Sequence, residues 1–118
     1  GLDISPVYGP WFAFRAAFLT RSPLPLTDIL PAASPCDTCQ DMPCIQACPV
    51  GAVQREEALD RERCLKRRFA DEGGCGIQCY SRLGCPIGIK WRYSQRQLHY
   101  HGKRSLQSLL AWKQASGC

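Results

Sequence analysis

The longest apolar stretch lies near the start of the chain, from Trp11 to Leu19, and Arg15 is its only polar interruption. Two prolines follow it within a few residues. The run has the length and composition of a strand or a short buried helix, and its periodicity does not decide between the two. Residues 31–35, PAASP, predict a turn-rich linker into the next region.

Beyond this linker the pattern predicts short helices rather than long elements. Between residues 36 and 86 cysteine, proline and glycine leave room only for short helices, the clearest at about residues 61–70, RERCLKRRFA. Near the end, LQSLLAW at residues 106–112 has the apolar spacing of a helix. The chain therefore divides into an N-terminal strand and linker segment (1–35), a central domain (36–88) and a C-terminal extension (89–118).

Small size and abundant cysteine indicate that something other than a large core stabilises the chain. It has 118 residues, enough for one small domain with a modest core, and nine of them are cysteine. Disulfides and bound metal are the two candidate staples, and they belong to different redox compartments. The odd number of cysteines argues against complete disulfide pairing.

Two further features concern the location of the chain. No apolar run approaches the roughly 20 residues of a membrane span, and the N-terminus lacks the basic, apolar and small-residue succession of a signal peptide. We therefore expect no membrane association and a reducing, cytoplasmic setting. The sequence begins at Gly1 rather than Met, as in a fragment or a processed product.

The cysteines form two similar groups. The first contains Cys36, Cys39, Cys44 and Cys48, separated by two, four and three residues and followed by Pro49. The second contains Cys64, Cys75, Cys79 and Cys85, with three and five residues between the last three and Pro86 after them. Bacterial ferredoxins wrap one cubane with a closely spaced trio, and the thiolate of a following Cys-Pro goes to the other cluster. Because proline turns the chain away, two such groups predict two 4Fe-4S clusters with crossed Cys-Pro ligands.

Structural zinc and disulfides are the alternatives for these thiols. Two tetrahedral zinc sites would also use eight thiolates, and the spacing from Cys36 to Cys39 is common in such sites. Zinc sites, however, usually pair two separated CxxC knuckles and do not need four clustered thiols that end in Cys-Pro. We therefore favour clusters over zinc, and zinc over disulfides. Cys118 lies outside the pattern and is interpreted as a free surface thiol.

The cysteine pattern and its flanks carry a family resemblance. The ending CPVGAV is similar to the Cys-Pro-x-x-Ala-aliphatic ending of the first half-motif in ferredoxins with two 4Fe-4S clusters. The wider order of a YGPWFAFRAAFL segment, a four-cysteine block, an LDRERC segment and a final Cys-Pro group resembles the ferredoxin module of the epoxyqueuosine reductase family and related cobalamin-dependent reductases. The resemblance spans roughly residues 7–88.

The resemblance implies a ligand set for each cluster. One cluster takes Cys36, Cys39, Cys44 and Cys85, and the other takes Cys48, Cys64, Cys75 and Cys79. Three loops are longer than in the family, namely those before Cys44, Cys79 and Cys85, and the added residues must bulge outwards. The region that binds cobalamin in that family is absent from this sequence, so the chain is not expected to be that enzyme by itself.

The positive charge of the chain is concentrated at its C-terminal end. Residues 86–118 contain six basic and no acidic residues, whereas residues 1–85 contain nine basic and ten acidic ones. The basic residues are interleaved with Trp91, Tyr93 and Tyr100. This composition over residues 90–104 suits RNA, an acidic electron-transfer partner or stabilisation of anionic clusters, and equally an ordinary solvated helix.

Other candidate residues carry less chemistry. His99 and His101 are two apart and are interpreted as surface groups. No catalytic triad or phosphate-binding loop stands out, so no independent catalytic site is visible and we assign no catalytic residues.

The sequence predicts a small α+β, ferredoxin-like protein with two 4Fe-4S clusters and a basic helical tail, acting in electron transfer with a redox partner protein or a missing catalytic domain. The alternatives are the electron-relay domain of a larger cobalamin- or flavin-dependent reductase acting on tRNA or a small molecule, and a zinc-stapled RNA-binding module.

Overall fold

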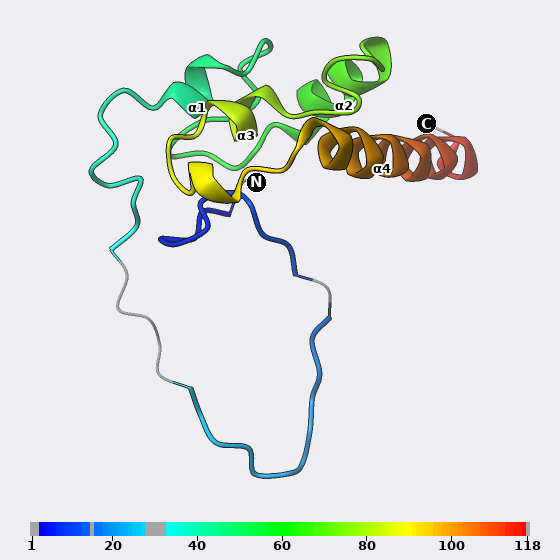
Figure 1. Cartoon of the computed structure of the whole chain (residues 1–118). Helices are drawn as coiled ribbons and strands as arrows, with labels where there is room; N and C mark the ends of the chain where they lie inside the picture. Colours follow the sequence, from blue (N-terminus) through cyan, green and yellow to red (C-terminus); the bar gives the residue numbers. More distant parts are fainter. Residues whose placement is uncertain (1–2, 15, 28–32, 118) are drawn as a thin grey trace.

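The architecture is a set of short helices joined by long connections, with one long helix at the C-terminal end (Figure 1). The computed structural model describes residues 3–14, 16–27 and 33–117. Its helices are α1 (Pro43–Gln46), α2 (Arg61–Ala70), α3 (Tyr80–Gly84), the 3-10 helix η1 (Ile89–Trp91) and α4 (Gln95–Ser116). Within the described residues the only β pairing is an isolated antiparallel bridge between Ser5 and Gly9. The α+β, ferredoxin-like class therefore stays a prediction.

Helix α2 forms over the residues that the sequence predicts, 61–70. Asp60 caps its start, because the Asp60 side chain accepts a hydrogen bond from the Arg63 backbone N–H at 2.9 Å. A carboxylate at this position satisfies a donor that the first turn leaves free and interacts favourably with the helix dipole. The predicted helix is confirmed, and it carries Cys64 near its start.

Helix α4 confirms the predicted helical tail. Ser94 and Gln97 form a capping box: Ser94 Oγ accepts from the Gln97 N–H at 3.3 Å, and the Gln97 side chain accepts from the Ser94 N–H at 2.9 Å. Leu98 and Leu106 are its buried residues and anchor one side of the helix. Among the described residues no helix has the length and apolar character needed to cross a membrane.

A close approach holds α4 against the rest of the molecule. Gly102 faces the loop between α2 and α3 so tightly that a Cβ at this position would collide with the Ile77 carbonyl. Beside this contact, the Arg68 guanidinium of α2 donates to the Gly76 carbonyl at 2.9 Å and to Ser105 Oγ of α4 at 3.3 Å. One arginine thus ties together α2, the loop and α4.

Pro10 and Trp11 are fixed by contacts with the second half of the chain. Trp11 is buried, and the Arg82 guanidinium lies 5.0 Å from the centre of its ring. Arg82 Nε also donates to the Pro10 carbonyl at 2.7 Å, and the Tyr93 ring centre is 5.5 Å from that of Trp11. These contacts join residues about 70 positions apart in the sequence.

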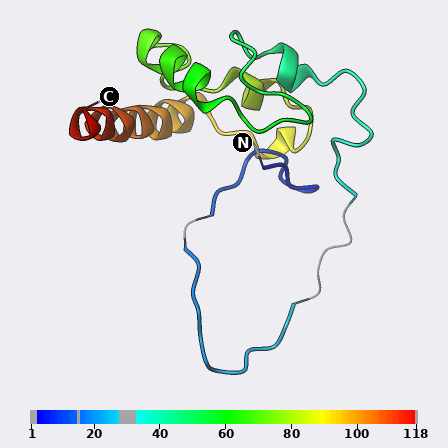
Figure 2. The same ribbon diagram turned by 180° about the vertical axis from the view of Figure 1, so that it is seen from behind.

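The segment that follows Trp11 differs from the prediction. The expected strand or buried helix over residues 11–19 is wrong for the described residues, which adopt neither form. Phe14 and Phe18 are 82% and 88% exposed. Figures 1 and 2 both show this part running away from the helices as an open loop, with no described segment beside it to pair or pack. The predicted linker 31–35 lies partly, and Cys118 wholly, outside the described residues.

Candidate metal centre

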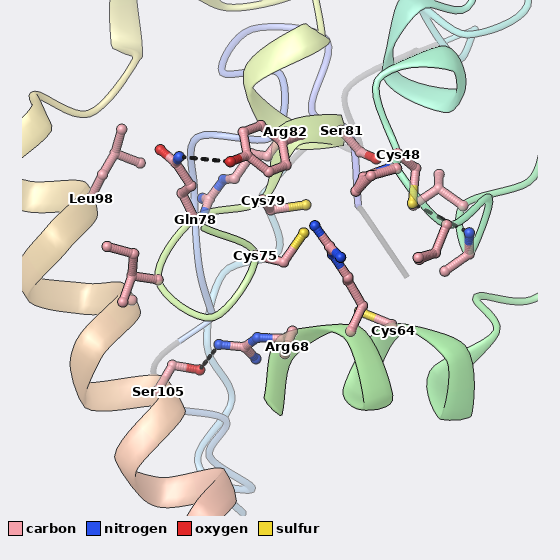
Figure 3. A pocket seen from close by; sticks show the side chains of 18 of the residues that line it. Cys48, Cys64, Arg68, Cys75, Gln78, Cys79, Ser81, Arg82, Leu98 and Ser105 are labelled. Atoms are coloured by element: carbon pink, nitrogen blue, oxygen red, sulfur yellow. Dashed lines mark hydrogen bonds between the residues drawn. The ribbon is translucent and has the colours of Figure 1, made fainter. Parts of the chain in front are cut away.

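Four of the predicted ligands line one cavity, which we call the second cavity. It has a volume of about 370 Å³, and its wall includes Cys48, Cys64, Cys75 and Cys79. These residues come from four separate places: the turn after α1, helix α2, the loop between α2 and α3, and the start of α3. Figure 3 shows the four side chains around the same space. The grouping is the one that the crossed arrangement requires for the second cluster.

Three of the remaining thiols line another cavity, which we call the first cavity. It has a volume of about 360 Å³, and Cys36, Cys39 and Cys44 contribute to its wall. Burial, followed by the neighbouring Cys85 thiol, raises the pKa of Cys44, and the thiols of Cys36 and Cys39 act in the same direction. Cys85, which is 4% exposed, therefore lies near Cys44.

Two short helices explain how the groups cross. Helices α1 and α3 pack against each other. Cys44 lies within α1 and Cys48 follows its end, while Cys79 and Cys85 are the two caps of α3. Each helix therefore supplies one thiol to each group. The assignment of these thiols as ligands stays a prediction.

Cys48 has surroundings that favour a thiolate. Burial by itself would raise its pKa, but hydrogen bonds from the backbone N–H groups of Val50, Val53 and Ala52 and from the Ser81 side chain outweigh burial, so that the pKa is lowered. The Ala52 N–H lies 3.3 Å from Cys48 Sγ. Thiolates rather than thiols ligate metals, and amide donors to sulfur stabilise that charge.

Cys64 has the opposite balance. Burial, followed by the Cys79 thiol, raises its pKa, while the Arg68 guanidinium opposes the rise and the thiols of Cys48 and Cys75 add to it. The three neighbouring thiols thus disfavour ionisation of Cys64, and a positive group is needed to offset the charge of a Cys64 thiolate among them. A bound metal cluster and nearby cations are the two sources of that charge.

The loop that carries Cys75 is fixed by Asp71. Its two carboxylate oxygens accept hydrogen bonds from the backbone N–H groups of Gly74 and Cys75, each at 3.1 Å. Arg67 completes the arrangement with an ion pair to Asp71 at 3.1 Å. The Cys75 N–H is the main cause of the lowered pKa of Asp71, and the charge of Arg67 acts in the same direction. Asp71 thereby holds Cys75 at the second cavity.

The thiols suit a larger group better than a single ion. Within the described residues no cluster of three or more His, Cys, Asp or Glu side chains is close enough to hold one metal ion. Tetrahedral zinc would need sulfurs roughly 3.8 Å apart, from Zn–S bonds of about 2.3 Å. The thiols instead surround cavities. A cubane spreads its ligands over four irons and so fits thiols that do not converge on one point.

A second observation concerns a buried polar atom. Arg67 lines the second cavity, and its Nε is buried without a hydrogen-bond partner in the described structure. Buried N–H groups in folded proteins almost always have a partner. The sulfur atoms of a cluster held by the four thiols would supply one. The residues present therefore fit such a group.

Some residues of the second cavity were not anticipated from the sequence. His99 and His101 are exposed, as expected, but His101 also lines the cavity from α4. Arg67 and Arg68 line it from α2. Their sequence signal was the separation of three and four residues from Cys64, which puts them on the same helix face.

Comparison with known proteins gives a partial match. Over 50 residues the chain is 38% identical to the ferredoxin-type protein NapG of Escherichia coli (strain K12) and, to the same extent, to that of Shigella flexneri. The match covers 38% of this chain and 22% of each relative, so the chain spans about a fifth of their length. No protein-family model and no solved structure matches the chain. The similarity supports a ferredoxin-like iron-sulfur protein.

Proposed function

We propose that this chain is an electron-transfer protein or module that binds two 4Fe-4S clusters. Its strongest support is the second cavity, whose wall includes four thiols drawn from separate segments of the chain. The partial similarity to ferredoxin-type proteins agrees with it. In this proposal Cys36, Cys39, Cys44 and Cys85 hold one cluster, and Cys48, Cys64, Cys75 and Cys79 hold the other.

The residues of the chain contribute position and charge. When bound, 4Fe-4S clusters supply reversible one-electron chemistry. The two caps of α3, together with Cys44 within α1 and Cys48 after its end, direct thiols to both groups. Amide donors around Cys48 stabilise a ligand thiolate, and the hydrogen bonds of Asp71 keep the Cys75 loop in place. These fixed contacts restrict the rearrangement that would accompany gain or loss of an electron.

The second candidate is the electron-relay domain of a larger cobalamin- or flavin-dependent reductase. It is supported by the loop after Trp11, where Phe14, Phe18 and Leu26 are almost fully exposed. Large exposed apolar side chains are typical of surfaces that meet another domain or chain. This candidate also includes the resemblance to the epoxyqueuosine reductase module. We further propose an α+β fold and a cytoplasmic setting. A zinc-stapled RNA-binding module is the third candidate.

The outer side of α4 is the surface that we propose for a redox partner. Arg96, Tyr100, Lys103 and Arg104 recur at helical spacing, opposite the buried Leu98, and all four are exposed. The inner side of the same helix lines the second cavity. Because a helix is about 10 Å across, a partner on the outer side would lie close to that cavity. Electron transfer requires the partner to lie close to the cluster, whereas RNA binding does not. The short distance from this surface to the cavity therefore favours an acidic redox protein over RNA.

Spectroscopy of anaerobically purified chain separates the candidate functions. We expect a brown protein whose broad visible absorption bleaches on addition of a chemical reductant and whose reduced form gives an electron-spin resonance signal. A colourless chain containing zinc, with no signal after reduction, would support the zinc module and contradict the proposal. Clusters that reduce but transfer no electron to carrier proteins would favour a relay domain that requires its own catalytic partner.

A further inference from the structure

One face of α2 carries a thiol and two guanidinium groups. Cys64, Arg67 and Arg68 are separated by three and four residues and therefore share a helix face. All three line the second cavity. Figure 3 shows Arg68 and Cys64 rising from the same helix beside the other thiols. A cationic face is thus built into the wall that the proposed cluster would contact.

Arg68 is a fixed and uncompensated charge. Its guanidinium donates to the Gly76 carbonyl at 2.9 Å and to Ser105 Oγ at 3.3 Å, both neutral acceptors. The ion pairs of the described residues join Arg63 to Asp60 and Arg67 to Asp71, and neither involves Arg68. Arg68 therefore keeps its full positive charge at the cavity, held by two hydrogen bonds.

Arg67 contributes a donor rather than a net charge. Asp71 neutralises it through the 3.1 Å contact with one terminal nitrogen. Its Nε, by contrast, is buried and has no hydrogen-bond partner among the residues that the structure describes. Because Arg67 lines the cavity together with the four thiols, the sulfur of a cluster held there would be an acceptor for this N–H, and donors to sulfur stabilise the reduced, more negative state.

The first cavity is less cationic. Its wall contains Arg55 and Arg61 together with Glu57, two positive charges against one negative. The wall of the second cavity contains Arg67, Arg68 and Arg82 and no carboxylate. Counting Asp71, which pairs with Arg67 just outside this wall, leaves two net positive charges at the second cavity against one at the first.

We infer that Arg68 and the free Nε–H of Arg67 make the second site the higher-potential site of the chain. The inference rests on the proposed function. A low-potential chemical reductant that loses one electron is itself oxidised; that electron would reduce the group held at the second site, while the group at the first site would stay oxidised. In the working protein the electron would move from the first site to the second, towards α4. Arg67 and Arg68 act here as positioning and tuning residues.

The test is a potentiometric titration of cluster-loaded chain, followed by electron-spin resonance. The two signals are assigned with variants that each lack one site, Cys36→Ala with Cys39→Ala and Cys64→Ala with Cys75→Ala. In the native chain we expect the second site to reduce first. Arg68→Gln should shift its potential to lower values and leave that of the first site unchanged, and Arg68→Lys should restore most of the difference. Arg61→Gln, which removes a cation from the first cavity, is the matched control and should shift only the first site.

Several outcomes would overturn the inference. If the first site of the native chain is reduced before the second, the inference is contradicted. This result needs no arginine variant, so it can be obtained even if a variant fails to load clusters. An Arg68→Gln chain with both potentials unchanged contradicts the role of Arg68. Chain without iron and sulfide would instead refute the proposed function, and this result is distinct from a loaded chain with the opposite order of reduction.

Discussion

Cys79 and Cys85 occupy the two caps of α3, yet they belong to different groups of thiols. Cys79 lines the second cavity with Cys64, whereas Cys85 lies beside Cys44 of the first cavity. A helix of five residues is about 7.5 Å long, and its two ends therefore reach different sites. In this arrangement neither site is completed by its own half of the sequence.

The contact between the N-terminal residues and the region after α3 depends on two glycines. Gly9 and Gly88 both have positive φ, and a Cβ on either would collide with the backbone of the other segment. We expect Gly88→Ala to destabilise the chain by about 1–3 kcal/mol, from left-handed strain and the collision. Denaturant unfolding of cluster-loaded chain, followed by tryptophan fluorescence, measures the loss. Gly73→Ala is the control, because a Cβ there meets nothing within 4 Å and φ is not positive; equal effects would refute the explanation.

Replacement of Gly102 in α4 by alanine should have opposite effects on the isolated helix and on the whole chain. Gly102→Ala should raise the helix content of an isolated peptide over residues 94–117, since alanine favours a helix over glycine by about 1 kcal/mol. In the whole chain it should instead lower stability, because the added Cβ would meet the Ile77 carbonyl. Circular dichroism of the peptide and thermal unfolding of the chain provide the two readings. A chain stabilised by Gly102→Ala would show that α4 does not approach the loop this closely.

Docking on the outer side of α4 should depend on its charge. We expect Arg96→Gln with Lys103→Gln to slow electron transfer with an acidic one-electron carrier such as flavodoxin, and to flatten the salt dependence of the rate. Arg21→Gln with Lys66→Gln removes two exposed cations elsewhere and is the control. Arg92 is left intact because its guanidinium donates to the Leu83 carbonyl at 2.7 Å. If the salt dependence of the rate is unchanged, α4 is an ordinary solvated helix and not a docking surface. If the variant instead loses only oligoribonucleotide binding, the result favours RNA as the partner.

Removal of the metal should unfold the chain. The buried apolar residues of the described chain are few: Trp11, Ala52, Cys85, Leu98 and Leu106. Such a core is small for a chain of 118 residues, so we expect binding of the proposed clusters to supply much of the folding free energy. Chelation under reducing conditions, followed by a calorimetric scan, should show loss of the cooperative transition. Metal-free chain with reduced thiols and a transition near that of the loaded form would contradict this.

The sequence was sufficient to predict features that rest on local chemistry. The helix at residues 61–70 was predicted from the stretch that proline and glycine leave free, and the helical tail from apolar spacing. The capping residues Asp60 and Ser94 fit the two helices. The second cavity brings together Cys48, Cys64, Cys75 and Cys79, and the first brings together Cys36, Cys39 and Cys44; the ligand sets themselves stay a prediction. Proline after Cys48 was the local signal that this residue leaves its own group.

Features that depend on distant partners were out of reach. Trp11 is buried because Arg82 and Tyr93 surround it, and no local pattern separates it from Phe14, which is exposed. The apolar composition of residues 11–19 predicted a strand or a short buried helix, whereas the interior that buries Trp11 does not extend to Phe14. Likewise, the close approach of Gly102 to the loop follows from packing between elements rather than from the sequence of α4.

The most direct test of the two-cluster account is the iron and acid-labile sulfide content of anaerobically loaded native chain and its Cys85→Ala variant. The account predicts about eight of each per native chain, from two 4Fe-4S clusters. In the variant the site of Cys36, Cys39 and Cys44 should lose iron or change its spectrum, while the site of Cys64, Cys75 and Cys79 stays intact. Native chain with zinc and no sulfide would contradict the clusters, and a Cys85→Ala chain altered only at the second site would contradict the crossing of ligands.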